Sequence, residues 1–195
     1  MEKVVEDVEF DQSVSPYLDL VELLSAVVEL PRHLNRPIKG VSANSRSVKP
    51  GYVFFATPGY GAFDGRDYIQ DAIVAGAIAV VSEIAANDEI KTSLIMPPGE
   101  KKGVIPHIQI PNLRALVGKI AAHYYGHPTQ QLQTIGVTGT NGKTTVTTLL
   151  TKALNNLGIK SGFIGTHGVG SDINHLKKTN MTTPGAFELQ AYMSG

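Results

Sequence analysis

The chain has 195 residues, 42% of them hydrophobic and 17% charged, with 17 basic and 17 acidic side chains. This balance is ordinary for a soluble globular protein and produces no overall field that would attract nucleic acid or an anionic membrane. The absence of cysteine excludes disulfides and thiolate metal sites. The acidic N-terminus does not resemble a signal peptide, and no apolar run reaches the ~18 residues of a membrane span. We therefore expect a cytoplasmic protein.

The first half of the chain alternates strand and helix patterns, which predicts a small α/β domain. Residues 1–17 show no clear periodicity. The elements expected after them, in chain order, are a helix from Asp19 that stops at Pro31, a strand near Gly40, a buried strand Val53 to Ala56, a helix capped by Asp67, a buried strand at 77–81, and one or two short strands within 87–110.

The second half predicts the opening of another α/β domain. We place the boundary near 108–112, which gives an N-terminal domain at 1–110 and a second, truncated domain at 111–195. Its expected elements are a helix capped by Asn112, a strand at Ile135 to Val137, a helix from the following loop to a glycine cap at Gly158, a short strand in 161–166, and a helix opened by Pro184 with Thr183 as its cap.

The stretch "TIGVTGTNGKTTVTTLL" is the most specific signal, because a glycine-rich turn between strand and helix can hold nucleotide phosphates. Lys143 would reach the β- and γ-phosphates as the catalytic cation, and the Thr144 hydroxyl would bind Mg²⁺. The strict P-loop has glycine where this chain has Val137. A plain Gly-Asn turn is the competing interpretation, but a lysine at a helix N-terminus is unfavourable unless an anion lies there. The predicted nucleotide-binding residues, which the family resemblance given next assigns to ATP, are Gly139, Thr140, Asn141, Gly142, Lys143, Thr144 and Thr145.

Three separated segments resemble one known family. "GVTGTNGKTT", "SANSRSVKPGYVFFATPGYGAFDGRDYIQDAIVAGAIAVV" and "MTTPGAFELQ" are similar, in this order, to segments of the Mur ligases, which are ATP-dependent amide-bond-forming enzymes with three domains. The resemblance covers about residues 38–195. It is greatest to the ligases that add the third amino acid of the peptidoglycan precursor peptide, and less to those that add D-alanyl-D-alanine.

The resemblance also implies a site for a uridine nucleotide. Asn44 stands where the family usually has aspartate, and Tyr60 could stack on uracil. For each of these residues a structural role remains open: a turn for Ser45, packing for Tyr60, and a helix cap for the threonines. The residues implied are Ser45 and Arg46 beside the uridine diphosphate, Tyr60, Gly61 and Ala62 in a second uridine loop, and Thr182 and Thr183 at the muramoyl group.

The implied reaction uses ATP and Mg²⁺ to join diaminopimelate or lysine to UDP-N-acetylmuramoyl-L-alanyl-D-glutamate through an acyl phosphate. The family's later metal ligands and its amino-acid-binding domain would fall beyond Gly195, so we expect this chain alone to bind UDP but to lack ligase activity. Two alternatives stay open, another Mur ligase and a non-catalytic nucleotide-binding module. His123 and His127 have a spacing that could ligate a metal, but helix-end structure is the favoured interpretation.

Overall fold

The computed structural model describes residues 18–59, 63–97, 103–172, 175–178 and 184–195. Its main feature is a five-stranded sheet with the strand order β1-β2-β3-β5-β4. Four strands are parallel, whereas β4 pairs antiparallel with β5 at one edge. This arrangement confirms the predicted α/β class. The strands are β1 (Gly40–Ser42), β2 (Tyr52–Ala56), β3 (Ala79–Ile84), β4 (Lys91–Ile95) and β5 (Ile105–Pro111).

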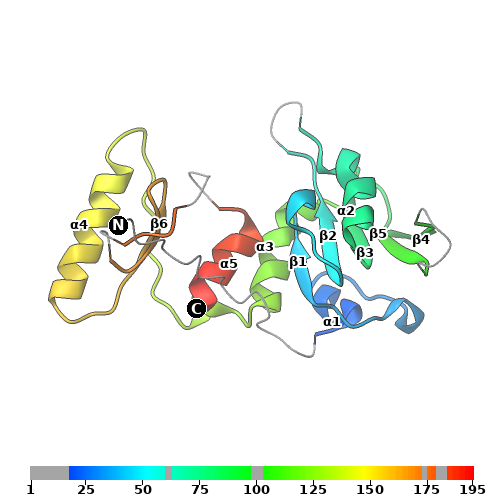
Figure 1. Cartoon of the computed structure of the whole chain (residues 1–195), viewed down its shortest axis with the longest axis horizontal. Coiled ribbons are helices and arrows are strands. Elements are labelled where there is room, and N and C mark those ends of the chain that lie inside the picture. The colour runs from blue at the N-terminus through cyan, green and yellow to red at the C-terminus, as the bar shows by residue number, and fades with distance from the viewer. Residues whose placement is uncertain (1–17, 60–62, 98–102, 173–174, 179–183) are drawn as a thin grey trace, which may run out of the picture.

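Helices cover both faces of this sheet, so the first part of the chain has three layers (Figure 1). Every residue of β2 is buried, and alternate side chains enter different cores. Val53 and Phe55 pack with helices α1 (Leu20–Leu24) and α3 (Leu113–Tyr124), whereas Phe54 packs with α2 (Ile69–Ala75). Burial on both faces explains why this strand is an uninterrupted apolar run.

Short 3-10 helices connect several of these elements. Two of them, η2 (Ser45–Ser47) and η3 (Gly65–Tyr68), follow the carboxyl ends of β1 and β2, and both contact α2. The others are η1 (Arg32–Leu34) and η4 (Pro128–Gln130).

The described part of the second half of the chain contains two further α-helices and a two-stranded ribbon (Figure 1). Helix α4 (Lys143–Asn156) ends with Gly158 at φ 79°, as predicted. The strands β6 (Phe163–Gly165) and β7 (Gly168–Gly170) pair antiparallel. Helix α5 (Ala186–Ser194) returns to the large sheet, where the Phe187 ring lies 4.8 Å from that of Phe55.

The expected helix from Asp19 to Pro31 is wrong in its length, because α1 ends at Leu24. Asp19 does cap it, since its carboxylate accepts the Glu22 N–H at 2.8 Å. The helix stops early because both the N–H and the hydroxyl of Ser25 bond to the Glu22 carbonyl, three residues back. A serine hydroxyl that competes for a backbone carbonyl disfavours a helix interior.

The predicted cap at Asp67 is wrong. Asp64 is the N-cap of η3, where its carboxylate accepts the Arg66 N–H at 2.9 Å, and α2 starts at Ile69 without a side-chain cap.

Asn112 does occupy the N-cap position of α3, but its side chain makes no capping bond. Glu83, at the end of β3, performs that role, because its Oε2 accepts the Arg114 N–H at 2.6 Å.

The second half departs from prediction in two places. Residues Ile135 to Val137 form no strand: Ile135 is 59% exposed, and no described strand pairs with this segment. Helix α5 begins at Ala186 with Gly185 as N-cap, so Pro184 precedes the helix, and Thr183 lies outside the described residues. The domain boundary near 110 stays a prediction. Helix α3, which follows that boundary, shares a core with the sheet.

Among the described residues, none of the helices is both long and apolar enough to cross a membrane.

Candidate functional site

The glycine-rich loop leads directly into α4. Gly139 and Gly142 have φ values of 148° and 79°, a region that side chains other than hydrogen rarely allow. The first helical bond runs from Val146 N to Gly142 O, so the N–H groups of Lys143, Thr144 and Thr145 precede the ladder. Such unpaired N–H groups at the positive end of a helix form an anion-binding arrangement.

The Lys143 side chain folds back across this loop. Its Nζ donates to the carbonyl oxygen of Gly139 and, at 3.3 Å, to that of Thr140. In the described part of the chain, no carboxylate forms an ion pair with this ammonium. The cation is therefore held at the loop by weak neutral acceptors, which an incoming phosphate could replace with a charge-assisted bond.

Thr144, the second residue of α4, is half-buried. Its neighbour Thr147, one turn on, donates its hydroxyl to the carbonyls of Lys143 and Thr144, each at 3.0 Å, and thereby faces the helix. The described residues contain no group of three or more acidic, histidine or cysteine side chains that could hold a metal by themselves. A magnesium ion would fit here only if nucleotide phosphates supplied most of its oxygens.

Ser45 and Arg46 open η2, immediately after β1. Asn44 caps this turn, because its Oδ1 accepts the Arg46 N–H at 3.1 Å. The buried Ser42 fixes the same corner, since its Oγ donates to the Asn44 carbonyl at 2.9 Å and receives the Asn44 N–H at 3.0 Å. Asn44 thus caps this turn, a role that the aspartate usual in the family could also perform.

The loop after β2 is closed at its base by backbone bonds. Pro58 and Asp64 form an antiparallel bridge, and the Gly59 N–H donates to the Phe63 carbonyl at 2.9 Å. Tyr60, Gly61 and Ala62, which the sequence nominates for uridine binding, lie outside the described residues, as do Thr182 and Thr183.

An ion pair that the sequence analysis missed braces this loop. Arg66 donates from Nε and Nη2 to the Asp64 carboxylate, with the shortest contact 2.5 Å, and from Nη1 to the Glu83 carbonyl at 3.4 Å. These hydrogen bonds lower the pKa of the Asp64 carboxyl. The loop is thereby tied to the end of the neighbouring strand β3. The Asp-Gly-Arg sequence at its base was the available signal.

The structure places Ser45 and Arg46 at one edge of the large sheet. Since β1 and β2 are parallel, with Ser42 opposite Phe54, η2 and the loop after β2 leave the same carboxyl edge. Ligands of open α/β sheets bind outside that edge. The phosphate loop lies on a separate part of the molecule, beside the ribbon β6–β7 (Figure 1). The candidate site is therefore two regions rather than one.

His123 on α3 and His127, the N-cap of η4, support a structural role. Their rings lie 5.8 Å apart, and His123 Nε2 is 3.1 Å from the Glu22 carbonyl of α1. A bond to a backbone carbonyl joins two helices and leaves that nitrogen occupied.

Two sequence models of one family match the chain. Residues 37–125 match "Mur ligase family, catalytic domain", and residues 137–195 match "Mur ligase middle domain". The chain belongs to the Mur ligase family. The carboxyl-edge region lies within the first match, and the phosphate loop from Val137 onward lies within the second. The resemblance inferred from the sequence is therefore confirmed.

Several individual Mur ligases that are similar to this chain share one name. The UDP-N-acetylmuramoyl-L-alanyl-D-glutamate--2,6-diaminopimelate ligase of Pseudomonas putida is 40% identical over 80% of this chain and 29% of its own length. The ligase of the same name from Chromobacterium violaceum is 41% identical over 83% of this chain and 30% of its own. A solved structure of a ligase with this name has a TM-score of 0.59 and 26% identity, over 89% of this chain and 33% of that one. The chain thus spans about 30% of the length of the curated relatives it matches.

Proposed function

We propose that this chain serves an ATP-dependent ligase that adds 2,6-diaminopimelate to UDP-N-acetylmuramoyl-L-alanyl-D-glutamate in the cytoplasm. The observation that supports this most is the phosphate loop at the start of α4, in a chain whose relatives are named for that reaction. The separate carboxyl edge of the large sheet offers a second region, which suits the uridine end of such a substrate.

The phosphate loop would hold ATP. Backbone N–H groups of Gly139, Thr140, Asn141, Gly142 and the first turn of α4 would surround the phosphates. Lys143 would leave its carbonyl partners for the β- and γ-phosphates. Thr144 would supply one oxygen to Mg²⁺, which neutralises phosphate charge when it is bound.

The uridine nucleotide would occupy the carboxyl edge. Ser45 and Arg46 are presented there by η2, and the Arg46 side chain is exposed. Tyr60, Gly61 and Ala62 would contribute from the loop after β2, and Thr182 and Thr183 from the segment before α5. These roles rest on the family resemblance and on the position of the flanking described residues.

In the proposed reaction, the D-glutamate carboxylate attacks the γ-phosphorus of ATP, giving an acyl phosphate and ADP. The amino group of diaminopimelate then attacks the acyl carbon, loses a proton and expels inorganic phosphate. Charge accumulates on the transferred phosphoryl oxygens, where Lys143 and the helix N-terminus would stabilise it.

Ligand binding to the 195-residue chain tests this proposal. Thermal unfolding would be followed with UDP-N-acetylmuramoyl-L-alanyl-D-glutamate, UDP and Mg-ATP in parallel. Each should stabilise the fold, by roughly 2.7 kcal/mol at 100-fold excess over Kd. Lys143→Met should weaken Mg-ATP binding about tenfold or more while leaving UDP binding unchanged. The matched control is Lys152→Met, an exposed lysine on the same helix.

Other results would favour the alternatives. Stabilisation by Mg-ATP alone would support a non-catalytic nucleotide-binding module. Tighter binding of the tripeptide-bearing UDP substrate than of the dipeptide-bearing one would support the ligase that adds D-alanyl-D-alanine. No stabilisation by any of these ligands would contradict the proposal.

A further inference from the structure

An exposed aromatic ring stands at the carboxyl edge of the large sheet. Phe63 is 54% exposed, although it directly precedes Asp64, the N-cap of η3. Its ring stacks on Tyr68, with centroids 5.3 Å apart and planes inclined by 22°. Stacking accounts for one contact of the ring, but more than half of the residue still faces solvent. The exposed part of the Phe63 ring therefore has room for a further contact.

The surroundings fix this ring in place. The Phe63 carbonyl accepts the Gly59 N–H, and the adjacent Asp64 bridges Pro58 and binds Arg66 through two nitrogens. A Cβ on Gly59 would lie 2.5 Å from Phe63 Cδ1, so only glycine there leaves room for the ring. A ring held by an ion pair, a backbone bond and a glycine is ordered in advance of any ligand.

The ring also lies at the edge where the nucleotide is proposed to bind. Phe63 follows β2, whereas Ser45 and Arg46 follow the neighbouring parallel strand β1. Both turns contact α2 on the same face of the sheet. A flat apolar surface and a serine–arginine turn at one sheet edge match the two ends of a nucleoside diphosphate, its base and its phosphates.

We propose that Phe63, supported from beneath by Tyr68, is the surface on which the uracil base stacks. This deepens the proposed function and rests on its uridine site. Aromatic side chains bind bases through their π faces, with little dependence on base identity. Phe63 would thus contribute affinity, and hydrogen bonds from other groups would select the pyrimidine.

Binding of UDP and of uridine to the full chain, measured by calorimetry, tests this assignment. Phe63→Ala should weaken both ligands by about the same factor, between tenfold and a hundredfold, because the ring contacts the base that they share. Phe63→Tyr keeps the ring and should bind within about threefold of the unmodified chain. Leu94→Ala, at a 55% exposed residue on β4, is the matched control and should bind normally.

A spectroscopic experiment gives an independent result. The chain has no tryptophan, so Phe63→Trp introduces a single reporter. UDP should quench its fluorescence through stacking, whereas inorganic pyrophosphate should not. Leu94→Trp should respond to neither ligand.

The outcomes separate this inference from the proposed function. If the unmodified chain binds no uridine ligand, both are contradicted. If it binds UDP but Phe63→Ala binds equally well with an unchanged melting temperature, only the stacking role is overturned. Loss of binding in Tyr60→Ala with retention in Phe63→Ala would likewise transfer the role to Tyr60. If Phe63→Trp binds UDP and its tryptophan fluorescence is not quenched, stacking is also contradicted.

Discussion

At the scale of single residues, the sequence predicted the glycine-rich turn before α4 but not the contacts of the charged side chains after β2. The Gly139 to Thr145 loop was predictable, because glycine and lysine at a helix start are unusual unless an anion binds there. The Asp64–Arg66 pair was not, because the spacing favoured Asp67 as the helix cap. Whether two charged residues two positions apart can meet depends on the turn between them, and here η3 brings them together. The exposure of Phe63 likewise required the fold.

His107 yields a prediction about pH. It is half-buried on β5, where its Nε2 lies 2.7 Å from Ser82 Oγ, and burial lowers its pKa. A folded-state pKa below the unfolded value of about 6.5 means that stability is complete above that pH and declines as pH falls toward the folded pKa. Thermal melting from pH 7.5 to 5 should show this decline, and His107→Gln should reduce it.

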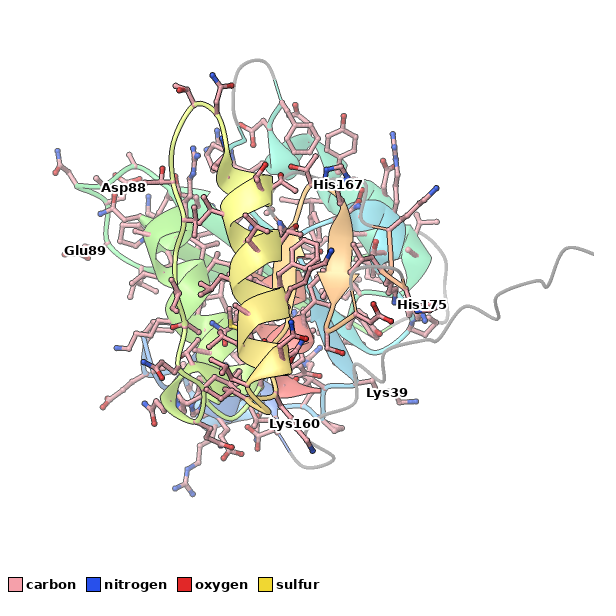
Figure 2. All side chains as sticks on the ribbon, turned by 90° about the vertical axis from the view of Figure 1, so that its left-hand side faces the viewer. Lys39, Asp88, Glu89, Lys160, His167 and His175 are labelled. Carbon is pink, nitrogen blue, oxygen red and sulfur yellow. The ribbon has the colours of Figure 1, made fainter. Side chains whose placement is uncertain are left out.

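The control is His167→Gln, which replaces an exposed histidine (Figure 2) and should keep the original pH dependence. An identical decline in His107→Gln and the unmodified chain would show that other groups cause it.

At the scale of elements, the strand and helices with long apolar patterns were predicted well, but the residues at which elements begin and end were not. Strand β2 and helices α3 and α4 appear where the periodicity places them. The expected strand at Ile135 to Val137 is absent, because a strand also needs a neighbour to pair with and β6 pairs only with β7 among the described strands. The predicted side-chain cap of α3 was wrong for a related reason. The group that caps this helix comes from β3, 31 positions away in the sequence.

The Glu83 cap gives a prediction at this scale. Glu83→Ala removes the acceptor of the Arg114 N–H and should lower the free energy of unfolding by about 0.5–2 kcal/mol. Urea denaturation measures this difference. Glu83→Gln keeps an oxygen acceptor and should lose less.

Glu89, an exposed residue on the turn between β3 and β4 (Figure 2), provides the control. Glu89→Ala should change the free energy of unfolding by no more than about 0.5 kcal/mol. Equal losses in Glu83→Ala and Glu89→Ala would argue against a capping role.

At the scale of the whole molecule, the α/β class was predicted and is confirmed, whereas the packing between the two halves was not predicted. Helix α5 comes from the second half of the chain, yet its Phe187 packs on Phe55 in the core of the first sheet. A contact between such distant residues leaves no local pattern. On α4, at one end of the molecule (Figure 1), Val146 and Leu149 are at least half exposed, as is Leu157 at its C-cap.

We propose that one chain holds two nucleotides in separate regions. Calorimetric titration of Mg-ADP into the chain, alone and after saturation with UDP-N-acetylmuramoyl-L-alanyl-D-glutamate, tests it most directly. We expect one Mg-ADP per chain in both titrations, because the phosphate loop and the carboxyl edge do not overlap. Displacement of one ligand by the other would reveal a single shared site and contradict binding in two separate regions.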